Sequence, residues 1–183
     1  MKKSFSNHIL ISMPHMNDPI FSKSIVLICD HSNDGAIGII INKPIDSKKS
    51  GMILLETELG IIKPKPTIYY GGPVNIESGI VLHNNKYIID ESINLSDHLS
   101  VTSSNKIIND MKDGNGPETY RIALGYSGWA SGQLEQEIMN GDWIPLSADS
   151  NFIFHIPDSQ KWAIAAAQIG LDIDHAGSNA GLA

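Results

Sequence analysis

Residues 125–138 read Gly125-Tyr126-Ser127-Gly128-Trp129-Ala130-Ser131-Gly132-Gln133-Leu134-Glu135-Gln136-Glu137-Ile138, a stretch we call the glycine block. It follows the apolar run Ile122-Ala123-Leu124, which is typical of a strand. Three glycines then interrupt the chain within eight residues, and Leu134 and Ile138 lie four apart, as on one face of a short helix. The block therefore predicts a strand, a glycine-rich turn, and a helix whose first N–H groups are unpaired.

The length and composition indicate one globular domain spanning residues 1–183. The chain of 183 residues is 42% hydrophobic, enough to bury a full core. No apolar run approaches the roughly 18 residues of a membrane span. Two lysines near Met1 are not followed by the hydrophobic region of a signal peptide, and Cys29 is a lone cysteine within an apolar run. We therefore expect a cytoplasmic protein without disulfides.

The charge of the chain argues against direct contact with nucleic acids. Twenty acidic residues outnumber thirteen basic ones, which gives a formal net charge of −7, and Arg121 is the one arginine. Proteins that bind nucleic acids carry basic surfaces that displace counterions, and they use arginine to recognise phosphate or guanine. The sequence also lacks a helix-turn-helix pattern.

The rest of the chain predicts strands that come in runs, with few helices between them. Strands are expected at residues 8–13, 24–30, 36–42, 67–70, 79–83, 118–124 and 151–156, and helices at 50–59, around 107–111, and after Pro157. An Asp-Gly pair at Asp34 predicts a hairpin between the second and third strands. Hairpins in runs favour an α+β fold with a mixed, curved or barrel-like sheet flanked by helices.

Two sets of side chains are candidates for catalysis. Ser127 lies in a glycine-rich stretch, but a nucleophile elbow needs glycine two residues before and two residues after the serine, and here the second position is Trp129. Asp30, His31 and His83 follow or end predicted strands, so they could converge as a hydrolase site or could simply form hydrogen bonds at strand ends. The histidine spacing and the lone cysteine predict no preformed metal site. The sequence also lacks a phosphate-binding loop, so we expect no cofactor.

A groove beside the glycine block is the alternative to a catalytic centre. The Gly71-Gly72-Pro73 turn is expected to lie against the block, and Gln133 and Glu137 are one helical turn apart. They could form the rim of a binding groove or an ordinary solvated edge, with the glycines serving only the turn. The candidate binding residues are Gly71, Gly72, Gly125, Ser127, Gly128, Trp129, Gln133 and Glu137. Trp129 is expected to pack in the core, and a tightly packed Gly128 predicts that Gly128→Val hurts folding.

Several motifs together resemble the YqgE/AlgH family of bacterial proteins, from about Ile9 to the C-terminus. They are Met13-Pro14 with Asp18-Pro19-x-Phe21, Ile28-Cys29-Asp30-His31, Gly35-Ala36-Ile37-Gly38 with Asn42-Lys43-Pro44, Gly71-Gly72-Pro73-Val74, Leu82-His83, the glycine block, and Trp143. The resemblance implies an α+β fold around a mixed, barrel-like sheet. Members are often labelled transcriptional regulators, with no agreed active site or cofactor. This chain departs at its tail, where Leu182 replaces the histidine that is common in the family.

Two hypotheses of function follow. The first is a cytoplasmic, non-enzymatic regulatory or binding protein that acts through a groove on an unknown protein or small-molecule ligand, without direct contact to nucleic acid or membrane. The second is a hydrolase that uses Asp30, His31 and His83, with the glycine block as an anion cradle. Convergence of these three side chains in a concave pocket would favour the enzyme. The oligomeric state does not follow from the sequence.

The charge leads to a first prediction, that the protein binds no specific DNA sequence at physiological salt. The acidic surface would repel phosphates, so any regulatory effect should pass through a protein or a metabolite. A fluorescence anisotropy titration against promoter fragments checks this. Submicromolar, salt-dependent binding to a defined operator would overturn it.

Overall fold

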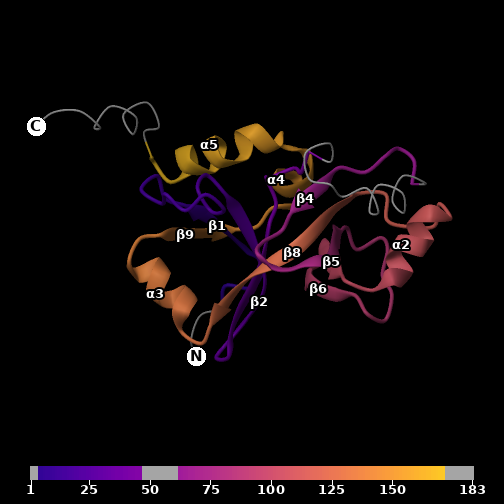
Figure 1. Ribbon diagram of the computed structural model, residues 1–183, viewed down its shortest axis with the longest axis horizontal. Helices are drawn as coiled ribbons and strands as arrows, with labels where there is room; N and C mark the ends of the chain where they lie inside the picture. The colour runs from indigo at the N-terminus through magenta and orange to yellow at the C-terminus, as the bar shows by residue number, and fades with distance from the viewer. Residues whose placement is uncertain (1–3, 47–61, 172–183) are drawn as a thin grey trace, which may run out of the picture.

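The computed structural model describes residues 4–46 and 62–171, and nine strands of these residues form one sheet (Figure 1). The strands are β1 (His8–Ser12), β2 (Ile25–Ser32), β3 (Gly35–Ile40), β4 (Ile68–Tyr70), β5 (Val74–His83), β6 (Ile93–Ser96), β7 (Leu99–Thr102), β8 (Tyr120–Ala130) and β9 (Trp143–Ser147). Their order is β6-β7-β5-β8-β3-β2-β1-β9, and all these neighbours are antiparallel. β4 lies outside that path and pairs with β8 in parallel, so the sheet is mixed. It curls into a half-barrel.

Helices of the described residues cover this sheet in three places. They are α2 (Asn105–Lys112), α3 (Gln133–Met139), α4 (Ser150–His155) and α5 (Asp158–Gln168). Figure 1 shows α4 and α5 along one side of the sheet, α3 below β9, and α2 beyond β5 and β6. The largest apolar cluster lies under α4 and α5, and the indole N–H of Trp162 fastens α5 by donating to the carbonyl of Ser12 at 2.8 Å. The predicted α+β class with a curved, mixed sheet is confirmed. No helix of this part of the chain is long and apolar enough to cross a membrane.

The glycine block differs from its prediction, because the strand before it does not end at Leu124. β8 continues to Ala130 and pairs with β3 over Gly35–Gly38. Gly132, with φ of 74°, is the residue that turns the chain into α3. Helix α3 begins at Gln133 and buries Leu134, as predicted. A strand can pass through glycines when its neighbours on both sides supply hydrogen bonds, which local sequence does not reveal.

Residues 151–156 were predicted to be a strand, and that prediction was wrong. They form α4, because the Asp149 side chain accepts hydrogen bonds from the N–H groups of Asn151 and Phe152 at 3.3 and 3.2 Å. This is an N-cap, and it satisfies donors that the first turn of a helix leaves open. Short apolar runs fit both states, and the cap decides here.

Other boundaries also differ from the prediction. β5 begins at Val74 and not near residue 79, and β6, β7 and β9 were not predicted. The predicted hairpin of β2 and β3 is confirmed, as are helix α2, which Ser104 caps, and helix α5. The predicted helix at residues 50–59 lies outside the described residues.

A close contact between two backbone segments, which we call the glycine junction, joins Gly71-Gly72 to Gly125. A Cβ atom placed on Gly71 would lie 2.2 Å from the carbonyl oxygen of Gly125, and one on Gly72 would lie 2.2 Å from the carbonyl carbon of Tyr126. Gly125 has φ of +68°, and its Cβ would lie 2.5 Å from the oxygen of Gly72. Backbone can approach backbone this closely only where neither side carries a side chain.

The same geometry corrects the expectation for Gly128. Its Cβ would meet the Tyr126 ring at 3.7 Å, an ordinary contact, and Gly128 itself is exposed. Gly128→Val should therefore change the free energy of unfolding by less than about 1 kcal/mol. Gly125→Val should cost more than about 3 kcal/mol or prevent folding, since it adds both strain and a backbone clash. Urea unfolding of the two variants compares them directly, and equal destabilisation would refute this account of the junction.

Candidate functional site

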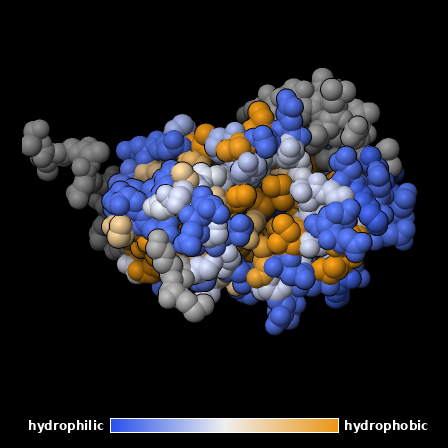
Figure 2. Space-filling model, turned by 90° about the horizontal axis from the view of Figure 1, so that it is seen from below, coloured by the Kyte–Doolittle hydropathy of each residue, from blue (hydrophilic) through white to orange (hydrophobic). Residues whose placement is uncertain are grey.

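An open groove of about 630 Å³ lies between the β2–β3 hairpin and strands β5, β6 and β7. Its lining residues are Cys29, Asp30, Ile37, Ile39, Asn75, Ser78, Ile80, Ile93, Val101, Thr102, Ser103 and Tyr126. Figure 2 shows the face that the hairpin and β6 share, with hydrophobic side chains gathered at its centre. Ile37 and Ile93 are 41% and 61% exposed, so two large apolar side chains of the lining face solvent. A volume of this size suits a small organic ligand.

Two irregular stretches of the sheet shape this groove. The β2–β3 register shifts between Ile28 and Asp30, and the β5–β8 register shifts between Val74 and Gly79. Asn75 lies in the second stretch with φ of 48°, a conformation that residues other than glycine seldom adopt. Bulges redirect side chains and interrupt pairing, and they occur often beside binding sites.

Among the described residues that line the groove, Asp30 is the one that carries a charge. It is exposed, and its carboxylate accepts no hydrogen bond from any described residue, which leaves it available to a ligand. Cys29 precedes it, and burial, with the charge of Asp30 adding to it, raises the pKa of the thiol to about 12. A thiol with this pKa is protonated at neutral pH and is a poor nucleophile.

The proposed hydrolase residues do not come together. Asp30 and His31 are successive residues of β2, and only Asp30 lines the groove. The His31 ring accepts the N–H of Phe5 at its Nδ1 atom and places Nε2 3.5 Å from Glu135 of helix α3. No hydrogen bond or ion pair joins these two residues to His83. The geometry therefore gives no support to a site built from the three.

His83 instead belongs to a buried chain of hydrogen bonds. Its Nδ1 atom faces the carbonyl of Asn84 and must donate, so Nε2 accepts from the hydroxyl of Thr102 at 2.9 Å. Burial lowers the pKa of His83 in spite of the Asn84 contact, which keeps the ring neutral at neutral pH. A histidine beside a hydroxyl resembles an activated nucleophile, but Thr102 is only 1% exposed and also bonds Ser92 at 2.8 Å. The chain of bonds satisfies polar groups of the interior.

Glu137 is held by two tryptophans. One oxygen of its carboxylate accepts the indole N–H groups of Trp129 and Trp143 at 2.8 and 2.9 Å, and the other accepts the side-chain amide of Gln133 at 2.9 Å. Both indoles are buried, and their rings meet edge to face at 6.1 Å. The predicted burial of Trp129 is confirmed. Gln133 in turn accepts the N–H of Ala130 at 2.9 Å.

The remaining candidate residues lie in or beside the glycine junction. Gly71, Gly72 and Gly125 are buried with their backbones in contact, so they form a wall and leave no cleft between the segments. Ser127 is 1% exposed and donates its hydroxyl to the Gly71 carbonyl at 3.4 Å. Tyr126, which the sequence did not single out, is the residue of the block that reaches the groove. A role of Gln133 and Glu137 in partner binding stays a prediction.

Most of the groove lining could not be recognised from the sequence. Asp30 was singled out, but Ile37, Ile80 and Val101 lie in apolar runs that predict core packing. The one local signal was the unusual pair of a cysteine and an aspartate that interrupts an apolar strand. Within residues 4–46 and 62–171, no group of three His, Cys, Asp or Glu side chains is placed to hold a metal ion.

Comparison with known proteins identifies the family of the chain. The AlgH-like family model matches residues 9–174, so the chain belongs to the AlgH-like family. A UPF0301 protein of Hahella chejuensis is 44% identical over 96% of this chain and 94% of its own length. A UPF0301 protein of Vibrio cholerae is 37% identical over 97% of this chain and 98% of its own length. The family resemblance drawn from the sequence motifs is thereby confirmed.

Solved structures agree with the fold. The solution structure of the AlgH protein from Pseudomonas aeruginosa superposes with a TM-score of 0.75 at 32% identity, over 100% of this chain and 98% of that one. A crystal structure from Corynebacterium diphtheriae has a TM-score of 0.72 at 23% identity, over 92% of this chain and 88% of that one. The second likeness concerns the fold alone.

The double contact at Glu137 predicts that this residue stabilises the fold. Glu137→Ala leaves two buried indole N–H groups without an acceptor and should lower the free energy of unfolding by about 2–4 kcal/mol. Gln136→Ala removes only an exposed pair with Asn140 from the same helix and should cost less than about 0.5 kcal/mol. Urea unfolding followed by tryptophan fluorescence measures both. Equal stability of the two variants would show that water replaces the carboxylate without cost.

Proposed function

We propose that this AlgH-family protein is a binding protein for a small organic cation, which it holds in the groove between the β2–β3 hairpin and strands β5–β7, without catalysis. The observation that carries the proposal is a single carboxylate, Asp30, set among apolar walls. Ligand sites are typically concave and mostly apolar, with few polar groups that fix orientation. An ammonium group at Asp30 and an apolar body along Ile37 and Ile93 fit this pattern.

The polar part of the lining supports the same ligand class. Ser78, Ser103 and Tyr126 supply hydroxyl groups, and Asn75 supplies an amide. These groups accept hydrogen bonds as well as donate them, whereas a site for an anion would need cationic side chains. The net charge of −7 also attracts cations toward the surface.

Binding without reaction is supported by the chemistry of the lining. The Cys29 thiol is protonated at neutral pH, and the Thr102 hydroxyl is buried and engaged. Neither is presented to the groove as an activated nucleophile, which would need an adjacent base and access to the substrate. A regulatory effect of the protein would then pass through its ligand.

An NMR titration with 2-phenylethylamine, compared with the neutral 2-phenylethanol, tests the proposal. The amine should shift amide signals of the groove strands and bind at least about threefold more tightly than the alcohol, since only the amine pairs with Asp30. Asp30→Asn should remove this difference. Asp34→Asn, which neutralises an exposed carboxylate of the nearby hairpin outside the groove lining, is the matched control.

The apolar wall has its own pair of variants. Ile93→Ser should weaken the binding of both probes, while Met139→Ser removes a 73% exposed apolar side chain elsewhere and should change nothing. Shifts that map outside the groove, or equal binding of amine and alcohol to the wild type, would overturn the proposal.

A further inference from the structure

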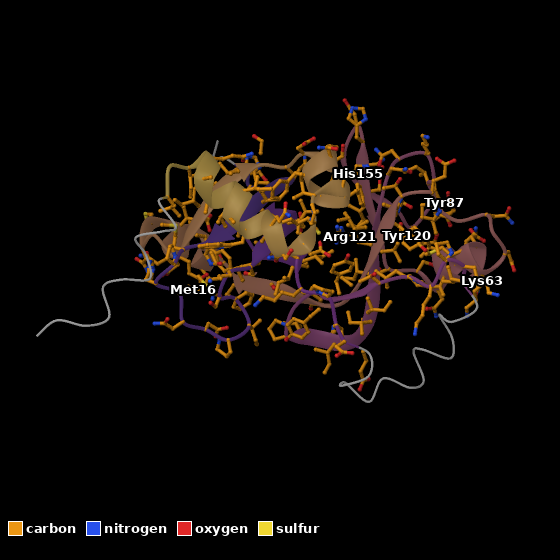
Figure 3. All side chains as sticks on the ribbon, turned by 90° about the horizontal axis from the view of Figure 1, so that it is seen from above. Met16, Lys63, Tyr87, Tyr120, Arg121 and His155 are labelled. Atoms are coloured by element: carbon orange, nitrogen blue, oxygen red, sulfur yellow. The ribbon has the colours of Figure 1, made fainter. Side chains whose placement is uncertain are left out.

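A second cavity, of about 360 Å³, lies between the segment 64–67, strand β8 and the end of helix α4. It shares no lining residue with the groove described above. Its lining includes Lys65, Thr67, Tyr69, Tyr120, Arg121 and His155. Figure 3 shows Tyr120, Arg121 and His155 grouped on this side of the molecule, with Met16 far from them.

Arg121, the one arginine of the chain, is the cationic centre of this cavity. The residue is 8% exposed, and its guanidinium carbon lies 4.5 Å from the centre of the Tyr69 ring. Nε donates to the carbonyl of Ile153 at 2.8 Å, and Nη1 donates to Asp158 at 2.9 Å and to the carbonyl of Ile41 at 3.3 Å. No described residue accepts a hydrogen bond from Nη2. The N–H groups of Nη2 are therefore available as hydrogen-bond donors to a ligand.

The charges around Arg121 do not balance. Asp158 accepts from Arg121 and from Lys161, which is fully buried, at 2.9 Å each, and from the Tyr69 hydroxyl at 3.0 Å. Two cations thus share one carboxylate. Burial lowers the pKa of Lys161, and Arg121 acts in the same direction against Asp158, as expected where positive charge exceeds negative. An uncompensated buried charge is costly, and a bound anion would offset it.

The rest of the lining supplies further groups that suit an oxyanion. Lys65 adds a second cationic side chain, and the hydroxyls of Thr67 and Thr119 can donate to an oxyanion. Glu118 is the one acidic residue among the described residues of this lining, and it pairs with Lys86 at 3.0 Å.

We propose that this cavity binds an organic oxyanion, a phosphate ester or a carboxylate, through Arg121 Nη2 and the hydroxyls of Thr67 and Thr119. The cavity is larger than an inorganic phosphate requires, and the aromatic side chains of Tyr120 and Phe154 line the remaining space. The ligand is therefore an oxyanion attached to a flat or apolar body. Arginine favours such groups because its planar N–H donors match two oxygen atoms.

An NMR titration with four probes tests the site: phenyl phosphate, benzoate, inorganic phosphate and the neutral benzyl alcohol. Amide shifts should map to Lys65, Thr67, the start of β8 and α4, and benzyl alcohol should not bind. Preference for phenyl phosphate or for benzoate identifies the source of the oxyanion. Binding of inorganic phosphate as tight as that of phenyl phosphate would overturn the part of the proposal that concerns the organic body.

Two exposed positions provide the variants, because Arg121 itself is part of the core. Lys65→Gln should weaken the preferred anion about fivefold. Thr67→Glu, which adds a negative charge to the lining, should abolish binding. The control is Lys106→Gln, which also removes one positive charge but lies on helix α2, outside this cavity. This variant should bind the anion as tightly as the wild type does. If folded Thr67→Glu binds as well as the wild type, or if no anion binds the wild type, the site does not exist.

Discussion

The contact between Gly71-Gly72 and Gly125 determines how the sheet curls. Along one edge of β8, residues Ile122–Leu124 pair with β4, and beyond Gly125 residues Ser127–Ala130 pair with β3. The strand therefore changes partner at the residue whose φ is positive and whose missing side chain admits the facing backbone. A strand that changes partner bends the sheet, as bulges and glycines do at the corners of barrels. Both the half-barrel and the groove on its face follow from this constraint.

The elements that the sequence predicted correctly are those set by short motifs, such as turns, caps and apolar faces. The Asp-Gly hairpin, the cap of α2 and the apolar faces of α3 and α5 are each determined by residues within the element or directly beside it. The course of β8 was missed, because glycines typical of a turn continue as a strand when β3 and β5 supply partners from distant sequence. The short strands β6 and β7 were missed for a similar reason: their pairing, and not their composition, makes them strands.

The candidate site was harder to predict than the fold. Asp30 was recognisable as an acidic residue that interrupts an apolar strand, but its neighbour His31 proved to contact Phe5 and Glu135 and not the groove. Which of two successive residues faces a cavity depends on register, and the shift at Ile28/Asp30 is set by the partner strand. Apolar lining residues such as Ile37 give the same sequence signal as core residues. Their exposure arises from the curvature of the sheet, which no local pattern contains.

The two cavities differ in how closely they are tied to the stability of the fold. The groove presents the exposed side chains of Asp30, Ile37 and Ile93, so an occupant held by these three could leave without disturbing the core. Arg121, in contrast, both lines the second cavity and fastens α4 and α5 to β8 through Ile153 and Asp158. An anion that compensates the charge of this cluster would bind the folded chain in preference to the unfolded one, and would strengthen the docking of both helices by that difference. Occupancy of this cavity by an anion would therefore be linked to the rigidity of the side of the sheet that α4 and α5 cover, while occupancy of the groove would not.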